Sequence, residues 1–255
     1  MYEKVCSIEN LQLADEKARK GKLRTYGVIE HDKKREVNLL KLRETLLNGT
    51  FHTSKYDVFT IYEPKEREIY RLPYFPDRIL HHAIMNVLEP IWVSTFTADT
   101  YSCIKNRGIH AAAKKVKQAL REDPEGTTFC LKLDIRKFYP SINHDVLKSI
   151  LRRKLKDKRL LRLLDEIIDS ADGVPIGNSL SQYFANLYLT YFDHWIKEQK
   201  RVKHYFRYAD DIVILASDKS YLHSLMGEIR AYLGDLKLEV KGNWQVFPVA
   251  ARGID

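Results

Sequence analysis

Two adjacent aspartates, Asp210 and Asp211, lie inside an otherwise apolar stretch that reads "RYADDIVIL". A third acid, Asp134, ends another apolar stretch, "FCLKLDI". Burying an unpaired carboxylate is costly, so such groups normally become neutral, pair with a cationic side chain or bind a metal ion. These three residues are therefore the first candidates for chemistry in the chain.

Carboxylate oxygens are the ligands that Mg²⁺ takes in proteins, where water and substrate phosphates usually complete its coordination. Aspartates at the ends of two separate strands can hold two ions about 4 Å apart, which activate an attacking hydroxyl and stabilise a leaving pyrophosphate. The alternative is that Asp210 and Asp211 only occupy a hairpin turn, where aspartate is common. The pair alone is more typical of that second role, so its surroundings must decide.

The residues around the acids predict strands. "HYFRY" and "IVILAS" flank a tight turn at residues 209–211, and residues 127–135 form a further strand. Periodicity and turn residues predict the other elements. Helices are expected at 7–20, 36–47, 77–90 (ended by Pro90), 111–122, 143–155 and 219–233, with a long amphipathic helix after "GVPIGN" up to Trp195, hairpin strands at 57–63 and 67–72, and a last strand at "LKLEV". This order predicts an α+β fold with an antiparallel sheet backed by helices.

Composition limits the function classes. The chain has 255 residues and a net charge of +9, which favours a polyanionic partner such as nucleic acid, although a basic surface can also serve solubility alone. Three widely spaced cysteines predict reduced thiols. No apolar run approaches the roughly 20 residues of a membrane helix, and the polar N-terminus has no signal-peptide core. We therefore expect a cytoplasmic protein.

Two further stretches surround the acids. "IRKFYPSI" follows Asp134 with two large rings and a rigid proline. In "GVPIGNSLSQYFANLYL", Gly173, Pro175 and Gly177 predict a tight loop at the start of a helix, as close backbone approach to a flat or anionic ligand requires. The alternative is a simple helix start capped by Asn178 or Ser179.

"LKLDIRKFYPSI", "GVPIGNSLSQYFANLYL" and "RYADDIVIL", in this order and spacing, resemble the palm motifs of reverse transcriptases, and the resemblance covers roughly residues 20–250. It implies a right-hand polymerase with fingers and palm and no thumb in this chain. Residues 1–125 would form an N-terminal extension and fingers, and residues 126–255 the palm, with a helical fingers insertion at about 143–172. The implied catalytic residues are Asp134, Asp210 and Asp211. With the backbone of Ile135, they would bind two Mg²⁺ ions, or Mn²⁺ in their place.

The resemblance also implies a nucleotide-binding set. Tyr139, five residues after Asp134, matches the aromatic residue that selects deoxyribose; plain core packing is the alternative. Lys65 and Arg67 match basic residues of the fingers hairpin that grip the triphosphate; a solvated turn is the alternative. The implied nucleotide-binding residues are Lys65, Arg67, Ile135, Phe138, Tyr139, Ile176, Gly177 and Gln182, with Ile135 and Phe138 acting through their backbone.

Ile176 stands where most relatives have glutamine, and Ser181-Gln182 stands where intron enzymes usually have Ser-Pro. "PIGNSLSQ" and "NWQVFPVAARGID" resemble the enzymes of diversity-generating retroelements, which copy RNA with errors at adenines. An isoleucine cannot make the hydrogen bond that a glutamine could give the nucleotide or template; a neutral difference is the alternative. Another bacterial reverse transcriptase (group II intron, retron or antiphage type) and a non-catalytic RNA-binding scaffold stay open.

The implied partners are an RNA template, a DNA or RNA primer, dNTPs and an accessory variability protein. The basic segment 148–162 could follow a phosphate backbone or contact that accessory protein, but an amphipathic helix with a solvated basic face explains it equally well. The chain stops at Asp255, before the primer grip and helical thumb of relatives. We therefore expect weak processive synthesis by these residues alone.

Overall fold

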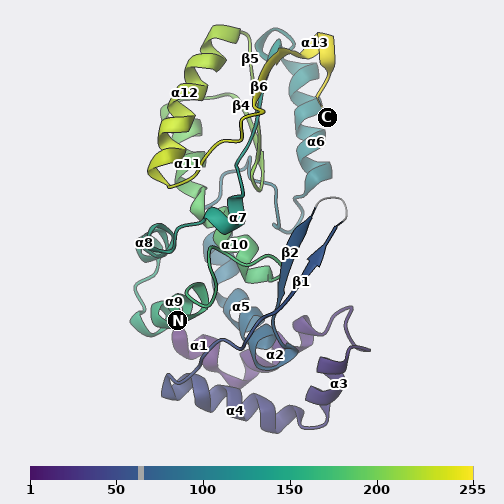
Figure 1. The fold of residues 1–255 in the computed structure, drawn as a ribbon, viewed down its shortest axis with the longest axis vertical. Helices are drawn as coiled ribbons and strands as arrows, with labels where there is room; N and C mark the ends of the chain where they lie inside the picture. Colours follow the sequence, from purple (N-terminus) through teal and green to yellow (C-terminus); the bar gives the residue numbers. More distant parts are fainter. Residues whose placement is uncertain (63–65, 255) are drawn as a thin grey trace. The chain divides into compact units, whose positions relative to one another are not determined.

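The computed structural model describes residues 1–62 and 66–254 (Figure 1). The chain forms two compact units, each built from two segments. Unit 1 comprises Met1–Ser94 and Leu147–Phe184, and unit 2 comprises Thr95–Val146 and Ala185–Asp255. The boundaries of these units differ from the expected boundary between fingers and palm at residues 125 and 126. The assignment of residues to fingers and palm stays a prediction.

Unit 1 is mainly helical. Its N-terminal helices are α1 (Tyr2–Cys6), α2 (Ile8–Ala18), α3 (Tyr26–Asp32) and α4 (Arg35–Asn48). The predicted helices at 7–20 and 36–47 are confirmed as α2 and α4. Helix α4 stops where expected because Gly49 takes a left-handed conformation, with φ of 68°, at its C-terminus.

Helix α5 (Ile79–Val93) is the central helix of unit 1 and packs on α1 and α2. It follows a π-helical turn, η1 (Tyr74–Arg78). The expected end at Pro90 is wrong, since Pro90 lies inside the helix. A proline removes its own N–H and disturbs the preceding turn, but its fixed φ is helical, so the chain can continue beyond it.

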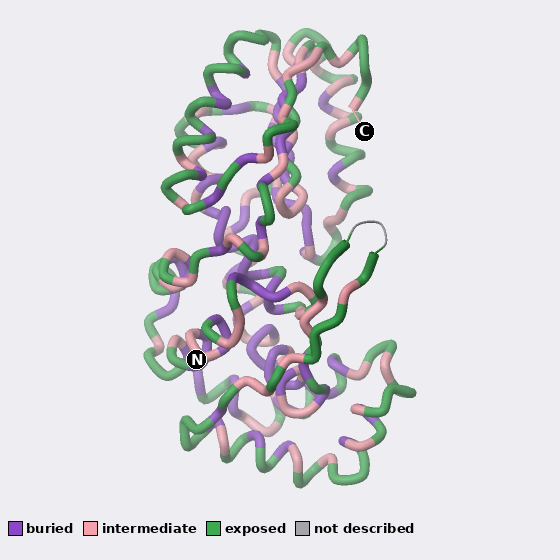
Figure 2. The backbone as a smooth tube through the Cα atoms, in the orientation of Figure 1, coloured by how far each residue is buried: buried purple, intermediate pink, exposed green. Residues whose placement is uncertain are grey.

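The predicted hairpin is confirmed as β1 (Asp57–Ile61) and β2 (Arg67–Arg71), which pair antiparallel with Ile61 opposite Arg67. Figure 2 shows most of this hairpin exposed. The turn that carries Lys65 lies outside the described residues.

The basic segment forms two helices, α8 (His144–Lys154) and α9 (Lys158–Ile168). Asp157 precedes α9 and accepts hydrogen bonds from the amides of Arg159 and Leu160 in its first turn. Ion pairs from Lys148 to Asp169 (2.6 Å) and from Arg152 to Asp165 (2.5 Å) neutralise part of the positive charge of the basic segment. Partial neutralisation weakens the case that the whole segment follows a phosphate backbone.

Unit 2 contains a four-stranded antiparallel sheet in the order β4-β5-β3-β6. The strands are β3 (Phe129–Asp134), β4 (His204–Tyr208), β5 (Asp211–Ala216) and β6 (Gln245–Pro248). Helices α6 (Ile109–Glu122) and α12 (Lys219–Asp235) lie on opposite sides of this sheet (Figure 1). The predicted α+β fold with an antiparallel sheet backed by helices is confirmed.

The long helix expected up to Trp195 is broken. It forms α10 (Ser179–Tyr188), α11 (Thr190–His194) and the π-helical turn η3 (Trp195–Gln199). Leu189, with φ of −98° and ψ of 1°, leaves the helical region. The apolar spacing continues through this break and therefore could not indicate it.

The expected strand at "LKLEV" is also wrong. Within that stretch, only Val240 forms an isolated antiparallel β-bridge, to Ile135, the residue that follows β3. The edge strand β6 is formed by residues 245–248 instead. The chain leaves the strand direction at Lys137, with φ of 45°, so β3 offers too short an edge for a longer ladder there. Among the described residues, no helix is long and apolar enough to cross a membrane.

Candidate catalytic site

The sheet of unit 2 brings the three predicted acids together. Asp134 is the last residue of β3 and Asp211 the first of β5, and they are directly opposed partners in the antiparallel ladder. Asp210 lies in the turn between β4 and β5, directly after Ala209, which has a φ of 54°. The tight turn predicted at residues 209–211 thus places all three carboxylates at one end of the central strands.

The cluster is electrostatically strained. Burial raises the pKa of Asp210 to about 6, and the neighbouring carboxylates of Asp134 and Asp211 add to that rise. Burial penalises the charged form, and like charges penalise it further. The site would therefore gain from a bound cation.

A lysine already supplies one positive charge. The ammonium of Lys241 donates a hydrogen bond to the carboxylate of Asp134, which raises the pKa of Lys241. Two backbone bonds hold the same segment against the end of β3: the amide of Lys241 donates to the carbonyl of Asp134, and the amide of Arg136 to that of Glu239, each at 2.8 Å. Sequence reasoning missed Lys241, which is 107 positions from Asp134.

The donor set fits Mg²⁺. Asp134 and Asp210 offer oxygen ligands next to each other, and relief of their repulsion favours a divalent ion. Within the described chain, no three acid, histidine or cysteine side chains are grouped closely enough to hold a metal ion by themselves. Water, backbone carbonyls and substrate phosphates would have to complete the coordination, as is usual for Mg²⁺.

The residues after Asp134 divide between core and site. The side chains of Ile135 and Phe138 are 1% and 2% exposed, so both belong to the core, and any contact with metal or nucleotide must use their backbone. Tyr139, in the short helix α7 (Phe138–Ser141), is half-buried with its ring edge-on to Phe138 at 5.5 Å. Burial raises the pKa of Tyr139, and nearby Cys103 and Asp210 raise it further. Tyr139 therefore lies near Asp210 of the acid cluster.

The other nucleotide-binding candidates are in unit 1. The loop before α10 docks on the hairpin: the amide of Tyr70 donates to the carbonyl of Ile176 at 2.9 Å, and the side-chain amide of Asn178 donates to the carbonyl of Tyr70 at 3.4 Å. Gly177 has a φ of 120°, and a Cβ there would lie 3.1 Å from the Tyr70 carbonyl oxygen. Glycine is thus required by both backbone conformation and space.

Arg67 is exposed at the start of β2, and Gln182 is exposed on α10. Within unit 1, the structure therefore brings Ile176 and Gly177 against the hairpin that begins with Arg67. Their role with a nucleotide stays a prediction, as does that of Lys65.

A second group that sequence reasoning missed lies beneath the turn. Arg207, in β4, has no exposed surface and binds Asp193 of α11 through two hydrogen bonds, of 2.7 and 2.5 Å. An arginine inside an otherwise apolar strand was the available signal.

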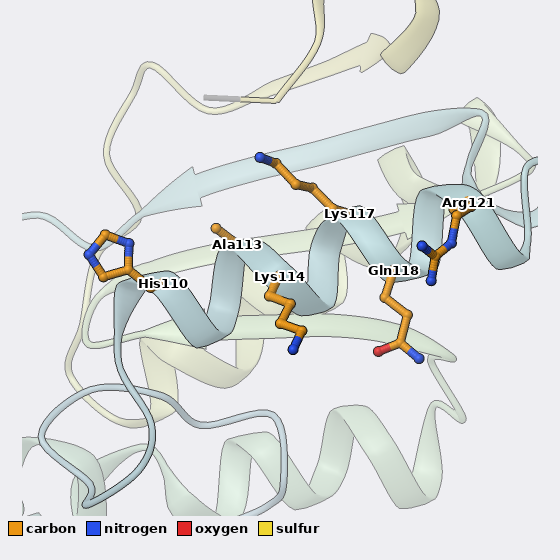
Figure 3. Close-up of a pocket in the computed structure, with 6 residues that line it drawn as sticks. All are labelled: His110, Ala113, Lys114, Lys117, Gln118 and Arg121. Atoms are coloured by element: carbon orange, nitrogen blue, oxygen red, sulfur yellow. The ribbon is translucent and has the colours of Figure 1, made fainter.

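A pocket of about 570 Å³ lies along α6, on the surface of unit 2 (Figure 3). Its lining consists of His110, Ala113, Lys114, Lys117, Gln118 and Arg121. Because this lining is basic and contains no carboxylate, it suits an anion and cannot replace the acid cluster as a metal site.

Comparison with known proteins shows the family to which the chain belongs. Residues 63–243 match the family described as reverse transcriptase (RNA-dependent DNA polymerase). Protein YkfC of Escherichia coli (strain K12) is 27% identical over 80% of this chain and 66% of its own length. The group II intron-encoded protein LtrA of Lactococcus lactis subsp. cremoris is 23% identical over 69% of this chain and 31% of its own length. The chain thus spans about two thirds or less of these relatives.

Solved structures agree on the fold. Apo telomerase from Candida tropicalis has a TM-score of 0.57 at 13% identity, over 79% of this chain and 45% of that chain. Telomerase from Candida albicans has a TM-score of 0.57 at 12% identity, over 82% of this chain and 45% of that chain. The residues matched by the family include β3, β4 and β5, which carry the acid cluster. The chain belongs to the reverse transcriptase (RNA-dependent DNA polymerase) family.

Proposed function

We propose that this protein copies an RNA template into DNA by adding deoxynucleotides to the 3′ end of a primer. The observation that carries the proposal is the opposition of Asp134 and Asp211 at the end of the central strands, with Asp210 in the adjoining turn at a raised pKa of about 6. A repulsive cluster of this kind favours binding of divalent cations and nucleotide phosphates.

Each candidate residue has a distinct role in this proposal. Asp134 and Asp210 hold two Mg²⁺ ions, with Mn²⁺ as the alternative, and Asp211 supports them. Bound ions of this kind activate the primer hydroxyl and stabilise the leaving pyrophosphate. Tyr139 limits the space at the 2′ position of the sugar, and Arg67, with Lys65, attracts the triphosphate.

Primer extension on a defined RNA template with Mg²⁺ and dNTPs tests the proposal. Asp210→Asn removes a metal-binding charge and should abolish extension. Asp235→Asn is the matched control, because it makes the same change at an exposed aspartate, the last residue of α12. Extension that survives Asp210→Asn, or is absent from the unaltered protein supplied with primer, template and metal, would refute the proposal.

We further propose that the enzyme is the error-prone, adenine-mutagenic type of a diversity-generating retroelement. The support is Ile176, an apolar residue in the loop that docks on β2, where a glutamine could make a directional hydrogen bond. The similarity to LtrA favours an intron-type enzyme as the second candidate.

Sequencing the extension products distinguishes the two candidates. The first predicts errors concentrated opposite template adenines and a several-fold lower error rate in Ile176→Gln. Accurate products from the unaltered protein, or an error spectrum that Ile176→Gln does not change, would remove the mutagenic role of Ile176 and favour the intron type.

The partners follow from the same proposal: an RNA template, a DNA or RNA primer and dNTPs, with an accessory variability protein if the enzyme is of the diversity-generating type. The net charge of +9 and the exposed lysines of α6 suit nucleic acid. Adding the accessory protein should raise the amount of cDNA from its cognate RNA more than from an unrelated template.

A further inference from the structure

Arg207 lies three positions before Asp210 and donates hydrogen bonds in two directions. Toward the interior, its Nε and Nη2 bind the carboxylate of Asp193 at 2.7 and 2.5 Å. Toward the turn, its Nη1 donates to the carbonyl oxygen of Ala209 at 2.9 Å. The same nitrogen also lies 3.3 Å from the side-chain oxygen of Asn186.

The guanidinium is firmly held. Arg207 and Asp193 are both 0% exposed, so water does not compete for their hydrogen bonds. Asp193 also accepts from the hydroxyl of Tyr205 at 2.5 Å and from that of Thr100 at 3.1 Å. A planar guanidinium bound through two of its edges cannot rotate without breaking several bonds at once.

The backbone around Arg207 is fixed as well. Its amide donates to the carbonyl of Asp99 at 2.9 Å, and its carbonyl accepts from the amide of Tyr101 at 3.0 Å. The side chain and main chain of Arg207 therefore form a fixed base directly beneath the turn.

The turn needs such a base. Ala209 has a φ of 54°, in the left-handed region, which is unfavourable for alanine. Its carbonyl belongs to the peptide group that joins it to Asp210, so the bond from Arg207 sets the orientation of that peptide. The direction of the Asp210 carboxylate depends on the same peptide.

We propose that Arg207, anchored by Asp193, is a positioning residue that fixes the Asp210 turn in its metal-binding orientation; this rests on the function proposed above. An ion pair that served the core alone would need only the bonds to Asp193. The additional bond to the Ala209 carbonyl is what couples the buried pair to the catalytic turn.

The test is the pair of substitutions Arg207→Met and Asp193→Asn in one protein. It removes both charges together, so no unpaired buried charge remains, and the asparagine oxygen can still accept from Tyr205 or Thr100. The readouts are kcat and KM for dNTP in primer extension, and hydrogen exchange of the amides at residues 209–211. Arg207→Lys is the second variant, because lysine is a point charge that cannot satisfy Asp193 and the Ala209 carbonyl in the same geometry.

We expect kcat to fall about 100-fold in both variants, the effect of a misplacement of about 1 Å, while KM changes by less than about threefold and turn amides exchange faster. Thr100→Val is the control: it removes one donor to Asp193 but leaves the Ala209 bond, so kcat should stay within about twofold. If the double variant does not fold, Arg207→Lys tests the positioning role by the same criteria.

A folded variant with unchanged kcat and unchanged exchange at the turn would overturn the proposal. If the unaltered protein makes no cDNA, the proposed function fails while exchange at the turn still tests the positioning role. Faster exchange in the variants would then support that role, and unchanged exchange would overturn it.

Discussion

Replacing Gly177 by alanine should release the loop that carries Ile176 from the hairpin of unit 1. Gly177 has a φ of 120°, a conformation that residues with a side chain rarely adopt. A Cβ at this position would lie 3.1 Å from both the Tyr70 carbonyl oxygen and the Cγ2 atom of Ile69. Relief of the unfavourable φ or of the contact with the Tyr70 carbonyl must move the loop backbone. The carbonyl of Ile176, which accepts the 2.9 Å hydrogen bond from the Tyr70 amide, would move with it.

The size of the effect follows from these contacts. Holding a non-glycine residue in such a conformation costs roughly 1–3 kcal/mol, and losing one backbone hydrogen bond costs roughly 1 kcal/mol more. The docked loop should therefore lose roughly 2–4 kcal/mol, which corresponds to about a 30-fold to 1,000-fold higher population of the released form.

Native-state hydrogen exchange of the Tyr70 amide measures this directly, because that amide is the donor to the loop. Gly227→Ala is the matched control: Gly227 lies inside α12, a Cβ there meets nothing within 4 Å, and alanine should stabilise the helix by about 0.5–1 kcal/mol. Exchange at Tyr70 in Gly177→Ala within threefold of the unaltered protein would refute the reasoning.

Three further predictions concern single side chains, His81, Lys241 and Tyr139. Burial lowers the pKa of His81 to about 4, so its unfolded state, with the ordinary value near 6.5, takes up a proton first as the pH falls. His81 should therefore contribute a decrease in stability of roughly 3 kcal/mol between about pH 6.5 and pH 4. His81→Leu should remove this part in urea unfolding at several pH values, while the part from His82, whose pKa burial also lowers to about 4, should remain. Lys241→Met removes a cation from the carboxylate of Asp134 and should tighten Mn²⁺ binding several-fold by calorimetry; weaker binding would show that Lys241 helps to form the site. Tyr139→Ala should raise ribonucleotide incorporation at least tenfold in competition with dNTPs, and no change would assign Tyr139 to the core alone.

The sequence was sufficient for the parts of the site that are local in the chain. Asp134, Asp210 and Asp211 could be found because each is a charge at the end of a short apolar strand or next to one, and the strands themselves follow from β-branched and aromatic residues. The hairpin 57–61 and 67–71 was predictable for the same reason.

Other parts depend on where the chain reverses direction, which neighbouring residues do not determine. Lys241 reaches Asp134 only because the segment after α12 turns back along the end of β3, with Lys237 at a φ of 62°. The alternating pattern of "LKLEV" favours a strand by itself, but the edge available to it ends within one residue of Asp134. Tertiary context overrode local propensity there.

Two aspartates in unit 2, the buried Asp193 and the partly buried Asp210, show what distinguishes a structural carboxylate from a candidate functional one. Asp193 has its charge compensated within the chain, by Arg207 and two hydroxyl donors, so it needs no ligand. Asp210 lies among carboxylates that raise its pKa, so its surroundings leave the ionised form destabilised. Both are acids within apolar sequence, and only the placement of their partners separates them. Incomplete compensation is the property that a metal ion and nucleotide phosphates would relieve, and in the proposed function this makes Asp210, and not Asp193, the residue that meets the substrate.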